Sequence, residues 1–208
     1  MRDRFESIYA TGEWGIGSGD GSDARDNAGY VKFLQRFLKD QQIKSVVDLG
    51  CGDWQTSRFV DWSGIHYRGF DLVRPVIEQN TASFGSPTVE FAVFSGDFAD
   101  LPAADLLIVK DVLQHWSNET VRGFLPTLQR YPYSLVTNCI FSRGSTANND
   151  ITDGGFRRLD MRLPPFSLQA EEMYDYSSSR PLWRRIIGRP VWRKSVLLVR
   201  GPGGGKAT

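Results

Sequence analysis

The segment SVVDLGCGDWQTSRFVDW, residues 45–62, most strongly constrains the fold of this chain. It begins with a short apolar run, which predicts a buried β-strand over Ser45–Leu49. The Gly50-Cys51-Gly52 turn follows, and we expect a helix from about Gln55. A strand, a Gly-x-Gly turn and a helix form the ligand-binding unit of doubly wound α/β folds. The chain is therefore expected to build a parallel sheet around this unit.

The remaining sequence alternates between apolar runs and helical patterns. Six further strands are expected, over residues 66–72, 88–94, 105–112, 133–140, 171–178 and 194–200. Helices are expected over residues 28–41, 73–84 and 117–131. Such alternation predicts a Rossmann-like three-layer α/β sandwich, with a mostly parallel seven-stranded sheet and an antiparallel last strand.

Composition limits the class of protein. The chain has 208 residues, which suggests one domain, and its formal net charge of +1 gives no overall field toward nucleic acid or a membrane surface. No apolar run reaches the roughly 18 residues of a membrane span. Charged residues rather than a signal-peptide pattern follow Met1, and two cysteines suit a reducing compartment. We expect a cytoplasmic protein with no nucleic-acid partner.

The domain is expected to span residues 1–200. Within it, residues 1–27 would form an N-terminal flap over the cofactor, and residues 141–165 a substrate loop, because this polar stretch has poor periodicity. The glycine-rich tail, residues 201–208, is expected to be disordered.

Charges around the glycine turn distinguish two classes of cofactor. Asp48 precedes the turn and Asp53 follows it, and two carboxylates would repel the pyrophosphate of a dinucleotide. Gln55 also stands where the dinucleotide fingerprint has its third glycine. Asp71, 19 residues after Gly52, lies where an acid that holds ribose hydroxyls is expected. The acids favour a cationic ligand with an amino-acid head and a sulfonium, which is S-adenosylmethionine.

Four ordered motifs carry a family resemblance. VVDLGCGDW, GFDL, SGDF and DLLIVKDVLQHW, which together extend over about residues 45–140, resemble class I S-adenosylmethionine-dependent methyltransferases. The KDVLQHW segment is similar to that of a bacterial and viral group linked to glycan biosynthesis. Trp54 departs from the family pattern, which usually has a small residue there; it either walls off the methionine end of the pocket or packs under the turn.

The resemblance implies a role for each motif residue. Asp48, Gly50 and Gly52 would face the methionine part of the cofactor, and Asp71 would accept hydrogen bonds from both ribose hydroxyls. Asp97 would accept from the adenine amino group, with Phe98 beside the ring. The full set expected to bind the cofactor is Trp14, Ser18, Gly19, Asp48, Gly50, Gly52, Asp53, Asp71, Leu72, Asp97, Phe98 and Lys110.

A second glycine-rich stretch, WGIGSGDGS at residues 14–22, is not preceded by a strand, so it is not the phosphate-binding type of loop. We interpret it as part of the flap, with Trp14 as an apolar lid and Ser18-Gly19 near the methionine carboxylate. The alternative is a flexible tether that touches no ligand.

The acceptor is expected to be an oxygen nucleophile. Methyltransferases that act on amino groups of bases or glutamine carry Asn/Asp-Pro-Pro-aromatic after the fourth strand, whereas this chain has KDVL there. An alcohol needs a base, and His115 lies just after that strand, at the edge where ligands bind. Asp111, four residues earlier, could orient the imidazole. We therefore expect His115 and Asp111 to be catalytic; the alternative is that His115 only lines the cofactor pocket.

The polar loop after the fifth strand supplies candidate acceptor ligands. Its oxygen-bearing residues suit a hydroxyl-rich substrate or Mg²⁺, so Asp111 with Asp150 or Asp153 could hold a metal, although the sequence does not establish one. Solvated turns are the competing interpretation of each residue. The residues expected to contact substrate are Asn138, Arg143, Asn148, Asp150 and Arg157.

The sequence favours O-methylation of a sugar or glycan hydroxyl. One alternative is a methyltransferase for a small non-sugar metabolite. Another is an inactive cofactor-binding protein, docked to a partner through the basic stretch Arg180–Lys194. That stretch could equally be a solvated face over an apolar hairpin.

Overall fold

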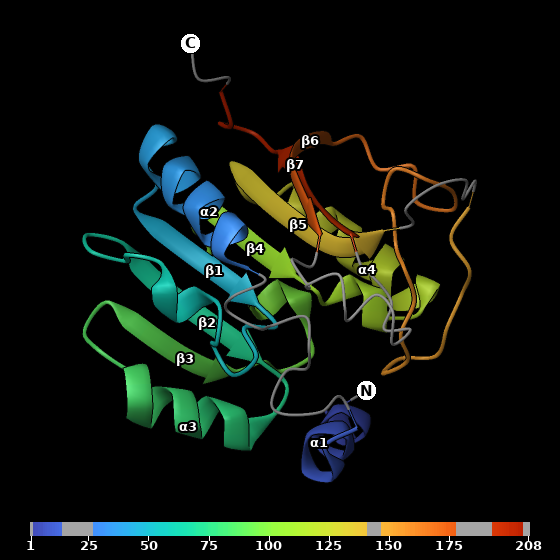
Figure 1. Cartoon of the computed structure of the whole chain (residues 1–208), viewed down its shortest axis with the longest axis horizontal. Helices are drawn as coiled ribbons and strands as arrows, with labels where there is room; N and C mark the ends of the chain where they lie inside the picture. The colour runs from blue at the N-terminus through green and yellow to red at the C-terminus, as the bar shows by residue number, and fades with distance from the viewer. Residues whose placement is uncertain (1, 14–26, 141–146, 178–192, 206–208) are drawn as a thin grey trace, which may run out of the picture.

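The computed structural model describes residues 2–13, 27–140, 147–177 and 193–205. Their centre is a seven-stranded sheet with the order β3-β2-β1-β4-β5-β7-β6 (Figure 1). β1 to β5 run parallel to one another, and β7 is antiparallel to both β5 and β6. The strands are β1 (Ser45–Leu49), β2 (His66–Asp71), β3 (Val89–Val93), β4 (Leu106–Lys110), β5 (Tyr133–Ile140), β6 (Glu171–Ser177) and β7 (Arg193–Arg200). The predicted Rossmann-like sheet with an antiparallel last strand is confirmed.

Helices cover both faces of the sheet, so each face packs against its own apolar cluster. α2 (Ala28–Asp40) buries Tyr30, Leu34 and Phe37 on one face, and α4 (Asn118–Leu128) buries Val121 and Phe124 on the other. Figure 1 shows α2 in front of the sheet and α4 behind it. The central strands β1 and β4 contribute to both clusters, which explains why apolar residues occupy successive positions in them, Val46-Val47 in β1 and Leu106–Val109 in β4.

Two further α-helices belong to the described part of the chain. α3 (Arg74–Phe84) follows β2 as expected, with a proline at its start. α1 (Arg2–Thr11) was not predicted, because the sequence suggested only the start of a flap there. It buries Phe5 and Ile8, and the Arg2 guanidinium donates a 2.7 Å hydrogen bond to the carbonyl oxygen of Phe94, just after β3. α1 therefore lies beside the carboxyl end of that strand (Figure 1).

The prediction of a helix from about Gln55 is wrong. The chain instead makes a single 3-10 turn, η2 (Ser57–Phe59). Trp54 has φ 59°, a left-handed conformation that interrupts a helix at its first residues. Its indole is then buried, as is that of Trp62, so apolar packing replaces helical hydrogen bonds in this segment.

The first five residues of the C-terminal tail, residues 201–205, have a described structure, which their glycine-rich composition did not suggest. The N–H group of Gly201 donates to the carbonyl oxygen of Pro132, and the Tyr133 hydroxyl donates to that of Gly205 at 3.2 Å. The tail was expected to be disordered from residue 201, but these contacts place residues 201–205; residues 206–208 lie outside the described part.

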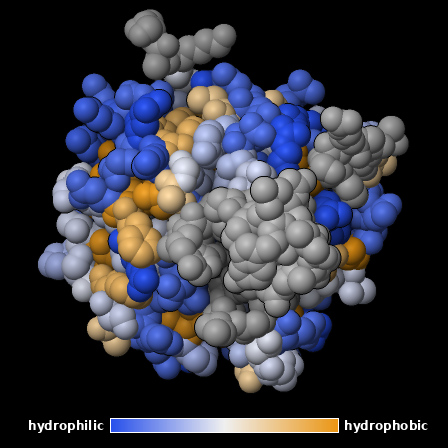
Figure 2. Space-filling view, in the orientation of Figure 1, coloured by the Kyte–Doolittle hydropathy of each residue, from blue (hydrophilic) through white to orange (hydrophobic). Residues whose placement is uncertain are grey.

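Among the described helices, none combines the length and apolar character needed to cross a bilayer. Figure 2, in the orientation of Figure 1, shows hydrophobic residues in small groups among hydrophilic ones.

Candidate active site

The glycine turn after β1 is held against the end of β2. Gly50 and Gly52 both adopt left-handed backbone conformations, with φ of 75° and 54°. A side chain at Gly50 would collide with Val112. The Asp71 carboxylate accepts hydrogen bonds from the N–H of Gly52 at 3.1 Å and of Val73 at 3.0 Å. The expected neighbours, the turn and the acid of the second strand, are thus brought together.

Three carboxyl groups gather around this turn. Burial raises the pKa of Asp48 to about 6, although the hydrogen bond from the Tyr67 hydroxyl, 2.7 Å long, opposes that effect. Burial also raises the pKa of Asp71, and the charge of Asp53 raises it further. The negative potential expected around the turn is therefore present, and it favours a cationic group over a phosphate.

Trp54 packs beneath the turn. Its ring lies 5.5 Å from that of Tyr67, 5.0 Å from that of Phe84 and 5.3 Å from that of Phe91, measured between centroids. Of the two interpretations of its sequence position, the structure supports packing under the turn.

The third motif lies at the expected edge of the sheet. The Asp97 carboxylate accepts from the N–H of Ala99 at 2.8 Å and so caps the 3-10 turn η3 (Phe98–Asp100). Phe98 stacks on Phe94, with centroids 5.7 Å apart, and Leu72 is half-buried against the same cluster. The capping role found for Asp97 occupies one of its carboxylate oxygens and stays compatible with adenine recognition by the other.

The end of β4 carries an unusual group of charges. Asp111 has φ 60°, a left-handed conformation that is uncommon for a residue other than glycine. Its Oδ2 atom lies 2.6 Å from the Nζ of Lys110 and 2.5 Å from the Nζ of Lys194, a residue of β7. Burial alone would raise the pKa of Asp111, but the two ammonium groups outweigh it and lower that pKa to about 2.

His115 is held by the loop opposite it. It ends the 3-10 turn η4 (Leu113–His115), and its Nδ1 lies 2.8 Å from the carbonyl oxygen of Gly155. A carbonyl oxygen only accepts, so Nδ1 carries the hydrogen and Nε2 is the basic nitrogen, which lies 3.4 Å from the side-chain amide nitrogen of Gln114. Burial lowers the pKa of His115, which keeps the ring neutral at pH 7. The structure thus gives the orienting role that we expected of Asp111 to the Gly155 carbonyl.

Much of the predicted substrate loop is tied down by its own polar groups. The Asn148 side-chain amide donates to the carbonyl oxygen of Asp160 at 2.8 Å, and its oxygen accepts from the N–H of the same residue at 3.0 Å. The Arg157 guanidinium donates to the oxygens of Asn118, Asn149 and Trp116. Both residues were predicted to contact substrate; Asn148 instead ties the loop to itself, and Arg157 holds the loop against the start of α4.

The acidic residues of this loop also accept hydrogen bonds from the start of α4. Asp150 accepts from the N–H of Asn118 at 2.8 Å, and Asp153 accepts from the N–H of Ser117 at 2.7 Å. No cluster of three or more metal-ligating His, Cys, Asp or Glu residues occurs within the described ranges. Each of the acids suggested for Mg²⁺ already has one oxygen engaged, by ammonium groups at Asp111 Oδ2 and by backbone N–H groups at Asp150 Oδ1 and Asp153 Oδ1.

The remaining residues predicted for the site lie on β5 or outside the described part of the chain. Asn138 is buried on β5, and within the described part of the chain its Oδ1 atom has no hydrogen-bond partner. Trp14, Ser18, Gly19 and Arg143 lie outside the described residues, as do residues 180–192 of the basic stretch.

A match to a family model decides the classification. The model of the O-methyltransferase domain matches residues 29–138, just over half of the chain. This chain belongs to the O-methyltransferase domain family. The matched range begins in α2 and ends in β5, so it includes the glycine turn, Asp71, Asp111 and His115.

Solved structures share the fold of this O-methyltransferase domain at low sequence identity. A protein from a study of the conversion of a disulfide bond into a thioacetal group during echinomycin biosynthesis has a TM-score of 0.59 and 16% identity, covering 100% of this chain and 95% of that one. Magnesium protoporphyrin IX methyltransferase from Synechocystis PCC 6803, solved with bound SAH, has a TM-score of 0.58 and 15% identity, covering 96% and 93%. The N-terminal domain of EvdMO1, solved in the presence of SAH and D-fucose, has a TM-score of 0.57 and 16% identity, covering 96% and 97%. No curated protein matches the sequence.

Sequence reasoning missed two contributors to the site of this O-methyltransferase domain. Lys194 was expected at the end of the basic stretch and the start of the last strand, with no role in the site, yet it is fully buried against Asp111. Gly155 was one residue of a polar loop, yet its carbonyl oxygen sets the tautomer of His115. The apolar run Val196–Val199 that follows on β7 was a usable signal, because it predicts a buried strand, and a lysine at a buried strand position needs a partner.

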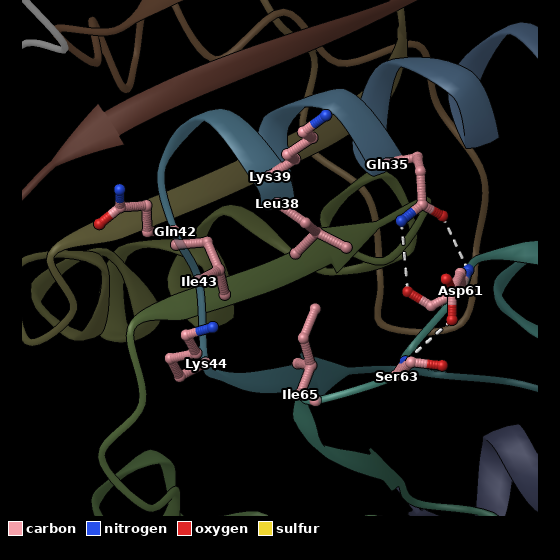
Figure 3. A pocket seen from close by; sticks show the side chains of 10 residues that line it. Gln35, Leu38, Lys39, Gln42, Ile43, Lys44, Asp61, Ser63 and Ile65 are labelled. Atoms are coloured by element: carbon pink, nitrogen blue, oxygen red, sulfur yellow. Dashed lines mark hydrogen bonds between the residues drawn. The ribbon is translucent and has the colours of Figure 1, made fainter.

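A hollow at the opposite edge of the sheet is separate from these residues. It is lined by Gln35 and Ile43 from α2 and its following turn, and by Asp61 and Ile65 from the segment before β2 (Figure 3). The Gln35 side chain and the Asp61 backbone exchange two hydrogen bonds beside it, of 3.3 and 2.7 Å. Ligands of such sheets bind at the carboxyl ends of the strands, so this hollow is not the candidate active site.

Proposed function

We propose that this O-methyltransferase domain transfers the methyl group of S-adenosylmethionine to a hydroxyl oxygen, with His115 as proton acceptor. The observation that carries the proposal is the 2.8 Å contact between His115 Nδ1 and the Gly155 carbonyl oxygen. It makes Nε2 the basic nitrogen of a neutral imidazole, at the edge of the sheet where the ligands of this fold bind. The acceptor hydroxyl would take the place of the long, 3.4 Å contact between Nε2 and the Gln114 amide nitrogen.

The residues at the glycine turn fit the proposed cofactor. Asp71, at the end of β2, is held by two backbone N–H groups, and a carboxylate fixed in this way suits the two ribose hydroxyls. The nearby carboxyls of Asp48 and Asp53 favour the cationic methionine part. The bare backbone at Gly50 and Gly52 allows close approach of that part. When bound, S-adenosylmethionine supplies a methyl group activated by its positively charged sulfur.

The protein's own contribution is to orient the acceptor and take up its proton. As the acceptor oxygen bonds to the methyl carbon, its O–H bond breaks and the proton passes to Nε2 of His115. Burial lowers the pKa of His115, so the ring is ready to accept a proton at neutral pH. A general base of this kind contributes about 10²–10⁴-fold in rate. None of these steps requires a metal at Asp111, Asp150 or Asp153.

We further propose that the acceptor is a sugar or glycan. Polar groups lie on the acceptor side of the site, where Asn138 and Asp111 have buried oxygens without a partner in the described residues. Such groups suit a ligand rich in hydroxyls. The presence of D-fucose with the fold relative EvdMO1 supports the same choice. A small hydroxylated metabolite other than a sugar is the competing acceptor.

Two measurements test the proposal. Calorimetry should show binding of S-adenosylhomocysteine, and no binding of NAD. Labelled methyl transfer should then be followed with a panel of free sugars, nucleotide sugars, oligosaccharides, phenols and hydroxy acids. Transfer to sugars supports the whole proposal, and transfer only to phenols or hydroxy acids contradicts the sugar acceptor. Cofactor binding with no transfer to any hydroxyl in the panel would refute O-methylation.

A further inference from the structure

A lysine on β7 is buried in the candidate active site. Lys194 has a side chain with 0% exposure, and its Nζ atom lies 2.5 Å from Oδ2 of Asp111, 83 residues away in sequence. Burying an ammonium group is costly unless it is paired, so a lysine at this position calls for an explanation. Burial lowers the pKa of Lys194 to about 8, in spite of the opposing charge of Asp111, and the lysine remains mostly protonated at pH 7.

Asp111 is fixed at both its backbone and one carboxylate oxygen. Its N–H group donates a 2.8 Å hydrogen bond to the carbonyl oxygen of Thr137, which holds the residue in its left-handed conformation at the end of β4. Both ammonium groups, of Lys110 and Lys194, contact the same oxygen, Oδ2. Backbone strain of this kind persists where the surroundings determine it, often at functional sites.

The other carboxylate oxygen remains available. Asp111 Oδ1 is buried, and it has no hydrogen-bond partner within the described part of the chain. A buried anionic oxygen without a donor is unfavourable, so it is expected to accept a hydrogen bond from a ligand. With its low pKa, Asp111 is a poor base; it can orient a hydroxyl but not take its proton.

Strand order places this oxygen on the acceptor side. The proposed cofactor residues, Asp71 and the glycine turn, belong to β2 and β1, whereas Asp111 follows β4 and Lys194 lies on β7 beyond β5. The charges of Asp111 and Lys194 also influence the pKa of His115, which places the group near the proposed base. Figure 1 shows these strands side by side, with β4 between β1 and β5.

We propose that Lys194 is a positioning residue of the acceptor site, which acts with Lys110 to hold the Asp111 carboxylate so that its Oδ1 accepts a hydrogen bond from a hydroxyl of the methyl acceptor. This inference rests on the proposed O-methylation. It assigns separate tasks, since His115 takes the proton and Asp111 aligns the molecule that loses it. The hydroxyl that Asp111 holds can be the reacting one or its neighbour on a sugar ring.

The first test uses two variants and a matched control. Lys194→Met removes the buried ammonium, and Asp111→Asn removes the charge of the carboxylate while keeping its size. Arg193→Met is the control, because Arg193 is the neighbouring residue of β7 and its side chain pairs with Asp175 at the surface. Each variant is assayed with the acceptor that the unaltered enzyme methylates fastest in the hydroxyl panel, and its affinity for S-adenosylhomocysteine is measured by calorimetry.

We expect the two variants to weaken binding of the acceptor and to leave binding of the cofactor nearly unchanged. Loss of a hydrogen bond to a charged group should raise the acceptor KM about 10- to 100-fold in Lys194→Met and Asp111→Asn. The Kd of S-adenosylhomocysteine should stay within about threefold, and Arg193→Met should match the unaltered enzyme in both measurements. A purely structural role for Lys194 would lower the melting temperature without this selective rise in KM.

A second readout is independent of turnover. In ¹³C NMR titrations, the Asp111 carboxyl should titrate at higher pH in Lys194→Met than in the unaltered protein, because one of its two ammonium partners is gone. The inference is overturned if Asp111→Asn, folded and able to bind S-adenosylhomocysteine, keeps the acceptor KM of the unaltered enzyme. A separate result, no methylation of any hydroxyl by the unaltered enzyme, would refute the proposed function and this inference with it.

Discussion

The His115 imidazole and the Gly155 carbonyl group meet across 2.8 Å, although 40 residues separate them in sequence. The N–H of Gly154 in turn donates a 2.8 Å hydrogen bond to the backbone carbonyl oxygen of His115. These two contacts fix both the position and the tautomer of the ring. Rigid support of this kind is what a proton-transferring side chain requires, because a small displacement is costly to the rate.

Replacement of His115 tests its role directly. His115→Ala should lower kcat by about 10²–10⁴-fold, because the acceptor proton then has no base, and should leave the affinity for S-adenosylhomocysteine within a few-fold. His66→Ala is the control, because His66 is exposed at the opposite, amino end of β2. An unchanged kcat in His115→Ala would remove His115 from the mechanism.

The pH dependence of the reaction follows from the buried imidazole. Burial lowers the pKa of His115 below its ordinary value of 6.5, so the neutral, basic form persists into mildly acidic solution. The fall in rate on the acid side should therefore be centred below pH 6.5. The measurement is kcat against pH with a saturating acceptor. A fall already centred at or above pH 6.5 would contradict the environment that the structure gives this ring.

Asp71 should control the affinity for the cofactor. Asp71→Ala removes the proposed acceptor of the ribose hydroxyls, and each hydrogen bond to a charged group contributes about 1.5–3 kcal/mol. It also releases the N–H of Gly52, which loosens the turn. The Kd of S-adenosylhomocysteine should rise at least about tenfold, whereas Glu78→Ala, at an exposed position of α3, should leave it unchanged. An unchanged Kd of S-adenosylhomocysteine in a folded Asp71→Ala protein would refute the assignment of Asp71 to the ribose hydroxyls.

The sequence predicts the frame of the site because its signals are local. A tight turn with left-handed residues needs glycine, and Gly50 and Gly52 occupy those positions. Short apolar runs define the parallel strands, and strand ends then bring Asp48, Asp71 and Asp111 to one edge. The helix expected at Gln55 fails because Trp54 adopts a left-handed conformation in order to bury its indole, and tertiary packing of this kind overrides helix propensity.

Contacts between distant segments could not be predicted in this way. Lys194 reaches Asp111 only because β7 inserts between β5 and β6 and runs antiparallel to both. The polar loop looked like a set of substrate ligands, but Asn148 and Arg157 satisfy backbone groups that the fold would otherwise leave unpaired. A polar residue type indicates a capacity for hydrogen bonds, and the fold decides which partner uses it.

The acids of the polar loop should affect stability rather than metal binding. Asp153 accepts hydrogen bonds from the Ser117 N–H and the Thr120 hydroxyl at the start of α4. Asp153→Ala should therefore lower the free energy of unfolding by about 1–3 kcal/mol, measured by urea denaturation. EDTA should leave methyl transfer by the unaltered enzyme unchanged. Loss of activity in EDTA, restored by Mg²⁺, would instead support the metal that the sequence left open.

Asp48 should make stability depend on pH in the acidic range. Burial raises its pKa from 3.8 in the unfolded chain to about 6, so between these values the folded protein binds more protons than the unfolded one. The contribution of Asp48 to the free energy of unfolding therefore falls as the pH rises from about 4 to about 6. A shift of this size corresponds to at most about 3 kcal/mol.

A comparison of variants isolates this contribution from that of His115. The lowered pKa of His115 acts in the opposite direction, because the unfolded chain then binds more protons below pH 6.5. Asp48→Asn keeps an oxygen that can accept from the Tyr67 hydroxyl but cannot ionise. The free energy of unfolding of Asp48→Asn, relative to the unaltered protein, should rise steadily from pH 4 to pH 6 in urea denaturation. Asp100→Asn, at an exposed position of η3, should show no such rise. A constant difference between Asp48→Asn and the unaltered protein would mean that folding leaves the pKa of Asp48 unshifted, which would contradict the effect of its burial.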